Sequence, residues 1–472
     1  MLFNSIQFLL FFPAVCVIYF CIPAGRVRLR NAFLLLASYY FYMNWEPAYA
    51  LLLLGSTAIT YLCALGMAGC HSSRPRKTFL WAGIMLNLLV LFLFKYYGFA
   101  SELAESLLSA AGLRHSFPRF GLLLPVGISF YVFQALGYTA DVYRGQVRAE
   151  RDFLTYALFV SFFPQLVAGP IERSARMLPQ FAEAHRPDYG RMLSGARLMA
   201  WGYFTKLVVA DRCGLYVDAV FNHVSMHNGG DCLLASLLFP FQIYGDFAGY
   251  SLIAIGTARV LGFRLCENFR RPYFASSVGE FWHRWHVSLS TWFRDYVYIP
   301  LGGNRAGRTR QYANLMVTFL LSGLWHGASL TFVAWGGLHG LLLCIEKALG
   351  VGDGRRRQRW LLPRRLLTFV LVALLWVPFR AATLGDAWLV VERMVGSPSL
   401  PDLSFAMFTE VTAAMAAIGV LMLREVADER GWRPSFLRRH PAAFTHAYIV
   451  VLACTILLLG VLGGDQFIYF QF

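Results

Sequence analysis

Long apolar runs recur from one end of the chain to the other, and they restrict its fold more than any other feature. A membrane-spanning helix needs about 20 apolar residues. Runs near that length occur at 4–22, 32–46, 48–69, 79–98, 121–140, 153–169, 194–211, 231–262, 312–346, 366–383, 405–423 and 444–462. Hydrophobic residues make up 57% of the chain and charged residues only 14%. The sequence therefore predicts an all-α, polytopic integral membrane protein with about ten to twelve spanning helices.

No polar stretch between these runs is long enough to form a separate soluble domain. Residues 1–472 are therefore expected to form a single membrane domain, with an aromatic C-terminal tail at 463–472. The first apolar run lacks a charged start and a small-residue cleavage site, so we interpret it as a retained span and not as a signal peptide.

The basic residues predict how the chain crosses the membrane. Lys and Arg gather in loops at 26–30, 74–77, 354–365 and 424–439. Such loops usually face the cytoplasm, which places the N-terminus and the tail on the outer side. The net charge of +16 does not indicate a nucleic-acid partner, because these residues lie in short loops between apolar runs.

Polar residues that bear chemistry gather between Asn268 and Gly340. Four of the eleven histidines lie there, namely His283, His286, His326 and His339. His326 lies in the middle of the apolar run 312–346, where an ionisable side chain indicates function. An imidazole can accept a proton from a hydroxyl near neutral pH, so His326 is a candidate base. The alternative is a histidine that bonds two helices together, but the flanking glycines favour function by allowing backbone or substrate to approach closely.

His283 and His286 are three residues apart, and on a helix this spacing would place them on one face. Together with His326 they could bind a metal ion. However, the chain has no HExxH motif, no CxxC pair and no carboxylate obviously paired with the histidines. We therefore predict no metal, and an intramembrane metal hydrolase remains an alternative.

Arginines accompany the histidines along the sequence. Arg294 fits an amphipathic helix at the cytoplasmic interface. The turn that ends at Arg305, followed by Arg308 and Arg310, could bind a phosphorylated donor such as the pyrophosphate of coenzyme A. Ordinary cytoplasmic-loop charge explains the same residues equally well.

Several motifs together resemble the bacterial membrane-bound O-acyltransferases, and within them the branch that acetylates alginate. The motifs are FWHRWHVSLSTWFRDYVYIPLGGNR (281–305), GLWHGASLTFVAWGGLHG (323–340), LPVGISF (124–130), FPQLVAGPI (163–171), QIYGDFAGY (242–250) and FIYFQF (467–472). The resemblance implies a ring of helices around a central tunnel that joins the two faces of the membrane.

The resemblance also implies roles for individual residues. His326 corresponds to the catalytic histidine, and His286 to a second polar position in the reaction chamber. His283 is a further catalytic candidate, although a D-alanine-transferring branch has asparagine there. Asp246 and Trp325 are supporting residues, and an Asp at membrane depth requires a partner.

The tail predicts either an aromatic anchor at the membrane surface or an acyl carrier. FIYFQF resembles the aromatic C-terminus of the small partner protein in teichoic-acid D-alanylation, whose tyrosine carries the acyl group. By that analogy Tyr469 is an acyl-carrier candidate. Its hydroxyl needs a base to become a good nucleophile, and His326 could supply one.

Taken together, these features predict an acetyltransferase of the bacterial inner membrane. Acetyl-CoA is the expected donor, and no permanently bound cofactor is expected. A periplasmic acetyltransferase would receive the acetyl group for O-acetylation of an exported, alginate-like polysaccharide. Cellulose or peptidoglycan acetylation, or a polysaccharide or lipid-linked sugar transporter without acyl chemistry, are the alternatives.

Overall fold

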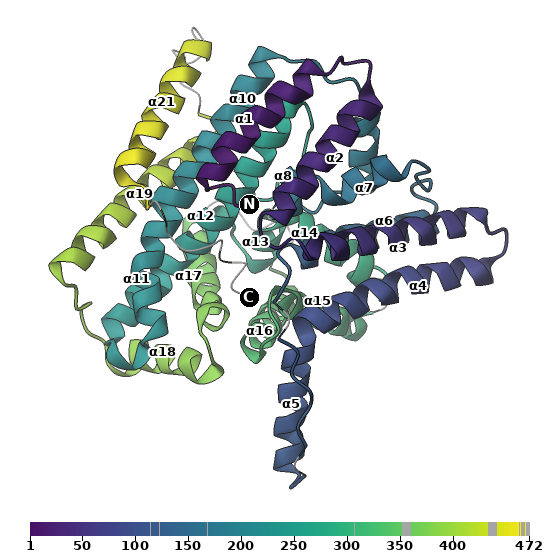
Figure 1. Ribbon diagram of the computed structural model, residues 1–472. Coiled ribbons are helices and arrows are strands. Elements are labelled where there is room, and N and C mark those ends of the chain that lie inside the picture. Colours follow the sequence, from purple (N-terminus) through teal and green to yellow (C-terminus); the bar gives the residue numbers. More distant parts are fainter. Residues whose placement is uncertain are drawn as a thin grey trace. The chain divides into compact units, whose positions relative to one another are not determined.

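The protein is helical throughout the part of the chain that the structure describes. The computed structural model describes residues 1–472 except 114, 122, 168, 306, 352–359, 433–440, 462, 464–467 and 469–472. No strand occurs among the described residues (Figure 1). The prediction of an all-α fold is confirmed.

The chain forms two compact units. The first comprises Met1–Met192 and Thr257–Cys266, and the second comprises Leu193–Gly256 and Glu267–Phe472. Every predicted site residue belongs to the second unit. The prediction that the whole chain is one domain around a tunnel stays a prediction.

In the first unit, α3, α4 and α6 pack side by side (Figure 1). Residues Asn44–Ala48 separate α2 from α3. A short π-helix, Phe92–Tyr96, joins α4 to α5. The helices are α1 (Ile6–Cys21), α2 (Val27–Met43), α3 (Tyr49–Gly69), α4 (Ser73–Leu91), α5 (Tyr97–Ala110), α6 (Ile128–Tyr143), α7 (Phe153–Ser161), α8 (Phe163–Leu166) and α9 (Ser174–Met177).

The second unit contains the longer helices and the connections between them. Most of α10 and α12 belongs to it, and a π-helix, Thr205–Ala210, joins α10 to α11. Its helices are α10 (Tyr189–Phe204), α11 (Asp211–Asn222), α12 (Gly229–Leu261), α13 (Val278–Arg284), α14 (Val287–Phe293), α15 (Arg308–His326), α16 (Leu330–Ala348), α17 (Leu361–Arg380), α18 (Leu384–Gly396), α19 (Phe405–Glu429) and α21 (Pro441–Leu459).

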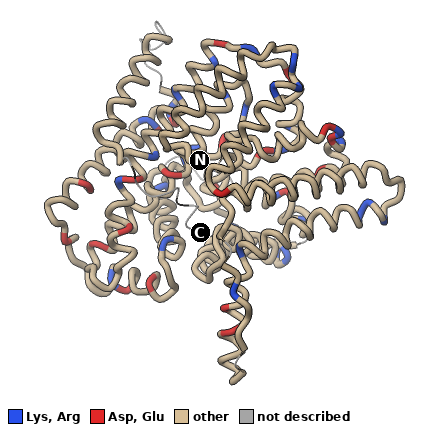
Figure 2. Tube along the Cα trace, viewed as in Figure 1, with Lys and Arg blue, Asp and Glu red and all other residues tan. Residues whose placement is uncertain are grey.

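Six of the described helices are long and apolar enough to cross a membrane, so this is a multi-pass membrane protein. They are α3, the continuous α4–α5 rod, α12, α17, α19 and α21. The middles of α3 and α21 carry no charged residue (Figure 2). The number is smaller than predicted because other apolar runs form helices that are either too short or not apolar enough along their length. α1 has only 16 residues, and run 312–346 is divided between α15 and α16.

Large aromatic side chains form the centre of the second unit. Trp285, Trp335 and Trp376 are fully buried. The ring of Trp376 stacks on Trp335 at 5.5 Å between centroids and lies 5.1 Å from Trp285. Because these three side chains come from different helices or connections, their packing fixes α16 and α17 against the chain around His286.

Helices α15 and α16 form a tightly packed hairpin. A Cβ atom on Gly323 would lie 2.2 Å from the backbone oxygen of Phe332, and one on Gly336 would lie 2.3 Å from that of Phe319. Only glycine allows this approach. Within a membrane, close packing through small residues replaces the hydrophobic drive that holds helices together in water.

Candidate active site

His326 lies at the tip of the α15–α16 hairpin. It is the last residue of α15, and Gly327 then has an extended backbone with φ −159° and ψ 147°. Ser329 begins α16, and its hydroxyl accepts a hydrogen bond from the Thr331 N–H at 3.3 Å. The prediction that His326 lies in the middle of a span is therefore wrong, because the helix ends at this residue.

The glycine after His326 serves helix packing. A Cβ on Gly327 would lie 2.1 Å from the Phe332 ring of α16. The close approach expected from the flanking glycines is thus made by the neighbouring helix. This contact holds the hairpin tip, and with it the His326 backbone.

One hydrogen bond assigns the proton on the His326 ring. Nδ1 lies 2.7 Å from the backbone oxygen of Ser322, one helical turn earlier. A carbonyl oxygen can only accept, so Nδ1 donates and carries the hydrogen. In the neutral imidazole Nε2 is then the basic nitrogen. The side chain is buried, with 2% of its surface exposed.

His286 lies in a left-handed turn between α13 and α14. Its φ is 41°, a conformation that non-glycine residues seldom adopt. His286 is fully buried, whereas His283 lies in the last turn of α13 and is exposed. The prediction that the two histidines share a helix face is wrong, because α13 ends at Arg284 and the chain turns before α14 begins.

The strained turn is braced by the chain that precedes it. The Arg270 N–H donates to the Arg284 oxygen at 2.8 Å, and the Val287 N–H donates to the Asn268 oxygen at 2.9 Å. The Asn268 side chain accepts from the Ser288 hydroxyl at 2.9 Å. Strain of this kind persists only where surrounding contacts enforce it, and it is concentrated at functional sites.

The two buried histidines lie close together in a cluster of aromatic side chains, formed by His286, His326, Trp325 and Phe247, that we call the histidine chamber. The His286 and His326 ring centroids are 6.4 Å apart and their planes are nearly perpendicular. The Trp325 ring lies 5.8 Å from His286 and 5.0 Å from His326, between ring centroids. Phe247 lies 4.6 Å from His286. The structure therefore brings together His326, His286 and Trp325, but leaves His283 outside this group.

Burial also affects the charge of His286, which lies outside the membrane-spanning helices. Removal from water, with a smaller contribution from the neighbouring His326, lowers the pKa of His286 well below its ordinary value. A neutral imidazole has one N–H donor. His286 is thus suited to donate a hydrogen bond to a developing negative charge.

His339 extends the histidine group, although no role was predicted for it from the sequence. The Trp335 ring lies between two histidines, 4.8 Å from His326 and 5.1 Å from His339. Nδ1 of His339 accepts a hydrogen bond from the Trp282 indole at 3.2 Å. In the sequence, the four-residue spacing of Trp335 and His339 already indicated that the two side chains lie on one face of a helix.

Asp246 has a buried cationic partner, as expected for a carboxylate at membrane depth. Its carboxylate lies 2.7 Å from the Lys206 ammonium, which is also 2.7 Å from Asp211. The backbone N–H of Ile468 donates to the second Asp246 oxygen at 2.7 Å. A lysine within the apolar run 194–211 was the signal for this pair. Tyr469, the next residue of the tail, lies outside the described residues.

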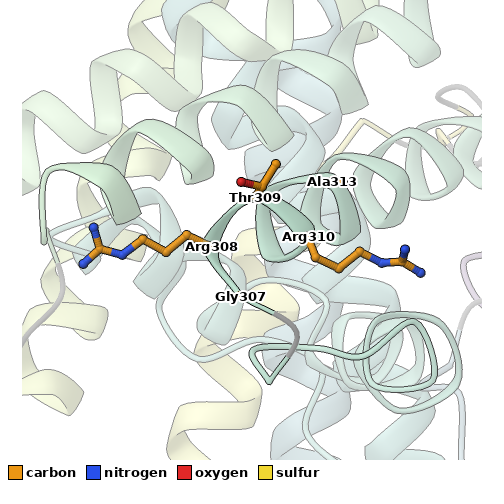
Figure 3. A pocket seen from close by; sticks show the side chains of 5 residues that line it. All are labelled: Gly307, Arg308, Thr309, Arg310 and Ala313. Carbon is orange, nitrogen blue, oxygen red and sulfur yellow. The ribbon is translucent and has the colours of Figure 1, made fainter.

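The predicted donor-binding arginines are exposed. Arg294 pairs with Asp295 at 2.8 Å, and Arg305 and Arg308 lie on the surface. Arg308 lines a shallow depression of about 410 Å³ at the start of α15. Figure 3 shows Arg308 and Arg310 extending in opposite directions from this helix end. They do not converge on a single point.

Among the described residues, no group of three or more His, Cys, Asp or Glu side chains could hold a metal ion. The metal-hydrolase alternative needs His283 beside His286 and His326. Exposure of His283 and burial of the other two do not favour that arrangement.

Comparison with known proteins identifies the family of this helical membrane protein. Residues 146–352 match the membrane-bound O-acyltransferase family, and this stretch contains both buried histidines of the chamber. The chain belongs to this family and is an O-acyltransferase.

Individual relatives extend the match over most of the chain. A probable alginate O-acetylase of Pseudomonas aeruginosa is 40% identical over 90% of this chain and 81% of the relative. A probable alginate O-acetylase of Pseudomonas putida is 37% identical over 100% of both chains. A peptidoglycan O-acetyltransferase of Helicobacter pylori is 34% identical over 84% of this chain and 80% of the relative.

Proposed function

We propose that this enzyme transfers an acetyl group from cytoplasmic acetyl-CoA across the bacterial inner membrane for O-acetylation of an exported, alginate-like polysaccharide. The observation that carries the proposal is the buried pair of His326 and His286. The hydrogen bond to Ser322 fixes the proton of the His326 ring on Nδ1 and leaves Nε2 as the base. The alginate O-acetylases among the relatives support acetyl as the group and alginate as the polymer class.

His326 acts as the general base and then as the general acid. Its Nε2 takes the proton of an attacking hydroxyl while the oxygen bonds to the thioester carbonyl carbon. The carbon–sulfur bond then breaks, and the coenzyme A thiolate receives the proton from His326. The Ser322 carbonyl holds Nδ1–H throughout and favours the protonated ring of the intermediate.

His286 stabilises the oxyanion that forms on the thioester carbonyl. A donor placed before the reaction in a chamber without water costs little reorganisation and stabilises developing charge strongly. The braced, left-handed turn fixes the His286 backbone in this way. Trp325 and Phe247 keep water from the chamber.

The donor enters from the cytoplasmic side. Arg294, Arg305 and Arg308, which are all exposed, meet the phosphates of acetyl-CoA at the surface. The basic loops support this orientation, in which the N-terminus and the tail lie in the periplasm.

The acyl group leaves through the tail. Tyr469 takes the acetyl group as an ester and passes it to a periplasmic acetyltransferase, which modifies the polymer. The contact between Ile468 and Asp246 supports a tail that reaches the chamber. His283, which is exposed, contributes less to catalysis than the two buried histidines.

One experiment tests the chemistry. Purified protein in lipid nanodiscs is incubated with acetyl-CoA, and release of the free thiol is followed. Wild type and His71→Ala, an exposed control, should consume acetyl-CoA, whereas His326→Ala should not. A polysaccharide transporter would not consume the thioester at all, and equal consumption by His326→Ala would remove His326 as the base.

A second candidate acceptor is peptidoglycan, which the Helicobacter pylori relative favours, and cellulose is a third. Acetyl content of alginate, cellulose and peptidoglycan from cells with and without the enzyme distinguishes them. A loss confined to alginate supports the proposal.

A further inference from the structure

The end of α21, the residues that lead into the tail, and the tail itself are held at three places within the second unit. The Arg212 side chain donates to the Leu459 oxygen at 2.7 Å, where α21 ends. The Val461 N–H donates to the Leu207 oxygen at 3.0 Å. The Ile468 N–H donates to Asp246 at 2.7 Å, and the Ile468 side chain is buried. The first two contacts hold the end of α21 and the residues that lead into the tail, and the third holds the tail itself.

The first attachments lie on or next to the π-helix Thr205–Ala210. Leu207 belongs to it, and Arg212 follows it by two residues. A π-helix changes the usual backbone hydrogen-bonding pattern and occurs often at functional sites. Lys206 lies in this same segment, so one irregular element holds the residues that lead into the tail and supplies the cation that pairs with Asp246.

The third attachment point is a buried charged group. Asp246, Lys206 and Asp211 have side chains that are 4%, 1% and 9% exposed. One ammonium between two carboxylates leaves one excess negative charge in this triad. Buried carboxylates need additional hydrogen-bond donors. The Ile468 N–H supplies one, and a charged acceptor makes this bond stronger than an ordinary backbone bond.

The helix that carries this attachment point also contributes to the histidine chamber. Phe247 follows Asp246 in α12, and its ring lies 4.6 Å from the His286 ring. The same short stretch of α12 therefore carries both the carboxylate that binds the Ile468 amide and a ring that packs against His286.

We infer that Asp246, fixed by Lys206, is a positioning residue that docks the tail through the Ile468 amide and so presents the tail to the histidine chamber. The inference deepens the proposed function and rests on it, because Tyr469 follows the docked residue directly in the sequence. In this role Asp246 touches neither donor nor acceptor. It sets the concentration of the acceptor hydroxyl near His326.

Two pairs of matched full-length variants isolate the docking bond. The first pair is Lys206→Met with Asp246→Asn, against Lys206→Met with Asp246→Leu. Both remove the ion pair and have similar volumes, but only asparagine can accept the Ile468 N–H. The second pair is Ile468→Pro against Ile468→Val, of which only proline lacks the N–H.

Hydrogen exchange of the tail, followed by mass spectrometry, measures docking without any chemistry. We expect the tail amides to exchange about tenfold faster in the Asp246→Leu form than in the Asp246→Asn form. Equal exchange in the two forms would overturn the inference. Thermal melting with and without acetyl-CoA identifies any variant that fails to fold, and the Ile468 pair then carries the test.

Acetyl transfer supplies the second readout. Ile468→Pro should transfer about tenfold more slowly than Ile468→Val, with the same KM for acetyl-CoA, because donor binding does not involve the tail. Equal rates would contradict a positioning role. The role of Tyr469 as acyl carrier is tested separately. Full activity of Tyr469→Phe would reject Tyr469 as the carrier, while hydrogen exchange of the tail that still depends on Asp246 would support the docking contact.

Discussion

The histidine chamber and the arginine-rich segment near the start of α15 belong to the same unit, yet they are built differently. His326 and His286 are buried, and helix ends, glycine contacts and backbone hydrogen bonds fix them. Arg305 and Arg308 are exposed on the surface. Proton transfer needs fixed geometry in a site without water, whereas a highly charged donor can be attracted by side chains in solvent.

The largest effect is expected in the buried region, at the proposed base His326. His326→Ala should lower the rate of acetyl transfer about 10²- to 10⁴-fold, because no other group in the proposed mechanism accepts the proton. Single-turnover assays with labelled acetyl-CoA measure this rate. Binding of acetyl-CoA should be retained, and a variant that loses binding but keeps the rate at saturating donor would reverse the assignment.

Substitutions at His286 and His283 compare a buried histidine with an exposed one. His286→Ala should slow transfer about 10²- to 10³-fold through loss of an oxyanion donor. His283→Ala, only three residues away but exposed, should lose much less. The same assay compares them at saturating acetyl-CoA. A larger loss at His283 would show that exposure is a poor guide to function in this segment.

Two neighbouring glycines test how the chamber is held. Gly336→Ala should lower the free energy of unfolding by about 1–3 kcal/mol, because the new methyl group meets the backbone of Phe319. Gly337→Ala should change it by less than about 0.5 kcal/mol, since its nearest neighbour is the Leu320 side chain at 3.5 Å. Denaturation in mixed micelles measures both, and equal values would rule out backbone contact between α15 and α16.

The smallest effect is expected among the arginines. Arg308→Ala should raise the KM for acetyl-CoA about two- to fivefold and leave kcat unchanged, as a solvent-exposed charge contact would. Arg74→Ala is the control, because Arg74 is an exposed arginine at the start of α4, outside the depression that Arg308 lines. Steady-state kinetics at low and high salt provides the measurement. A fall in kcat without a change in KM would show that Arg308 acts in the chemical step and not in donor binding.

The sequence was sufficient to predict the helical membrane fold and the family, since long apolar runs and linked motifs are local features. It also placed Trp325 beside His326 and required a partner for Asp246. It failed where the chain leaves a regular helix. The turn at His286 and the end of α15 at His326 depend on contacts with Asn268 and Phe332, which lie on other segments. The roles of Lys206 and Trp335 likewise become visible only after folding.

The braced turn at His286 has a consequence for how such enzymes can diversify. Main-chain hydrogen bonds from residues 268–270 set the path of the turn, so the path depends little on which side chain it carries. The positive φ admits His, Asn, Asp or Gly but penalises β-branched residues. Substitution there can therefore change the group offered to the substrate while the surrounding architecture stays intact. A new acyl specificity could arise at this position without a redesign of the scaffold.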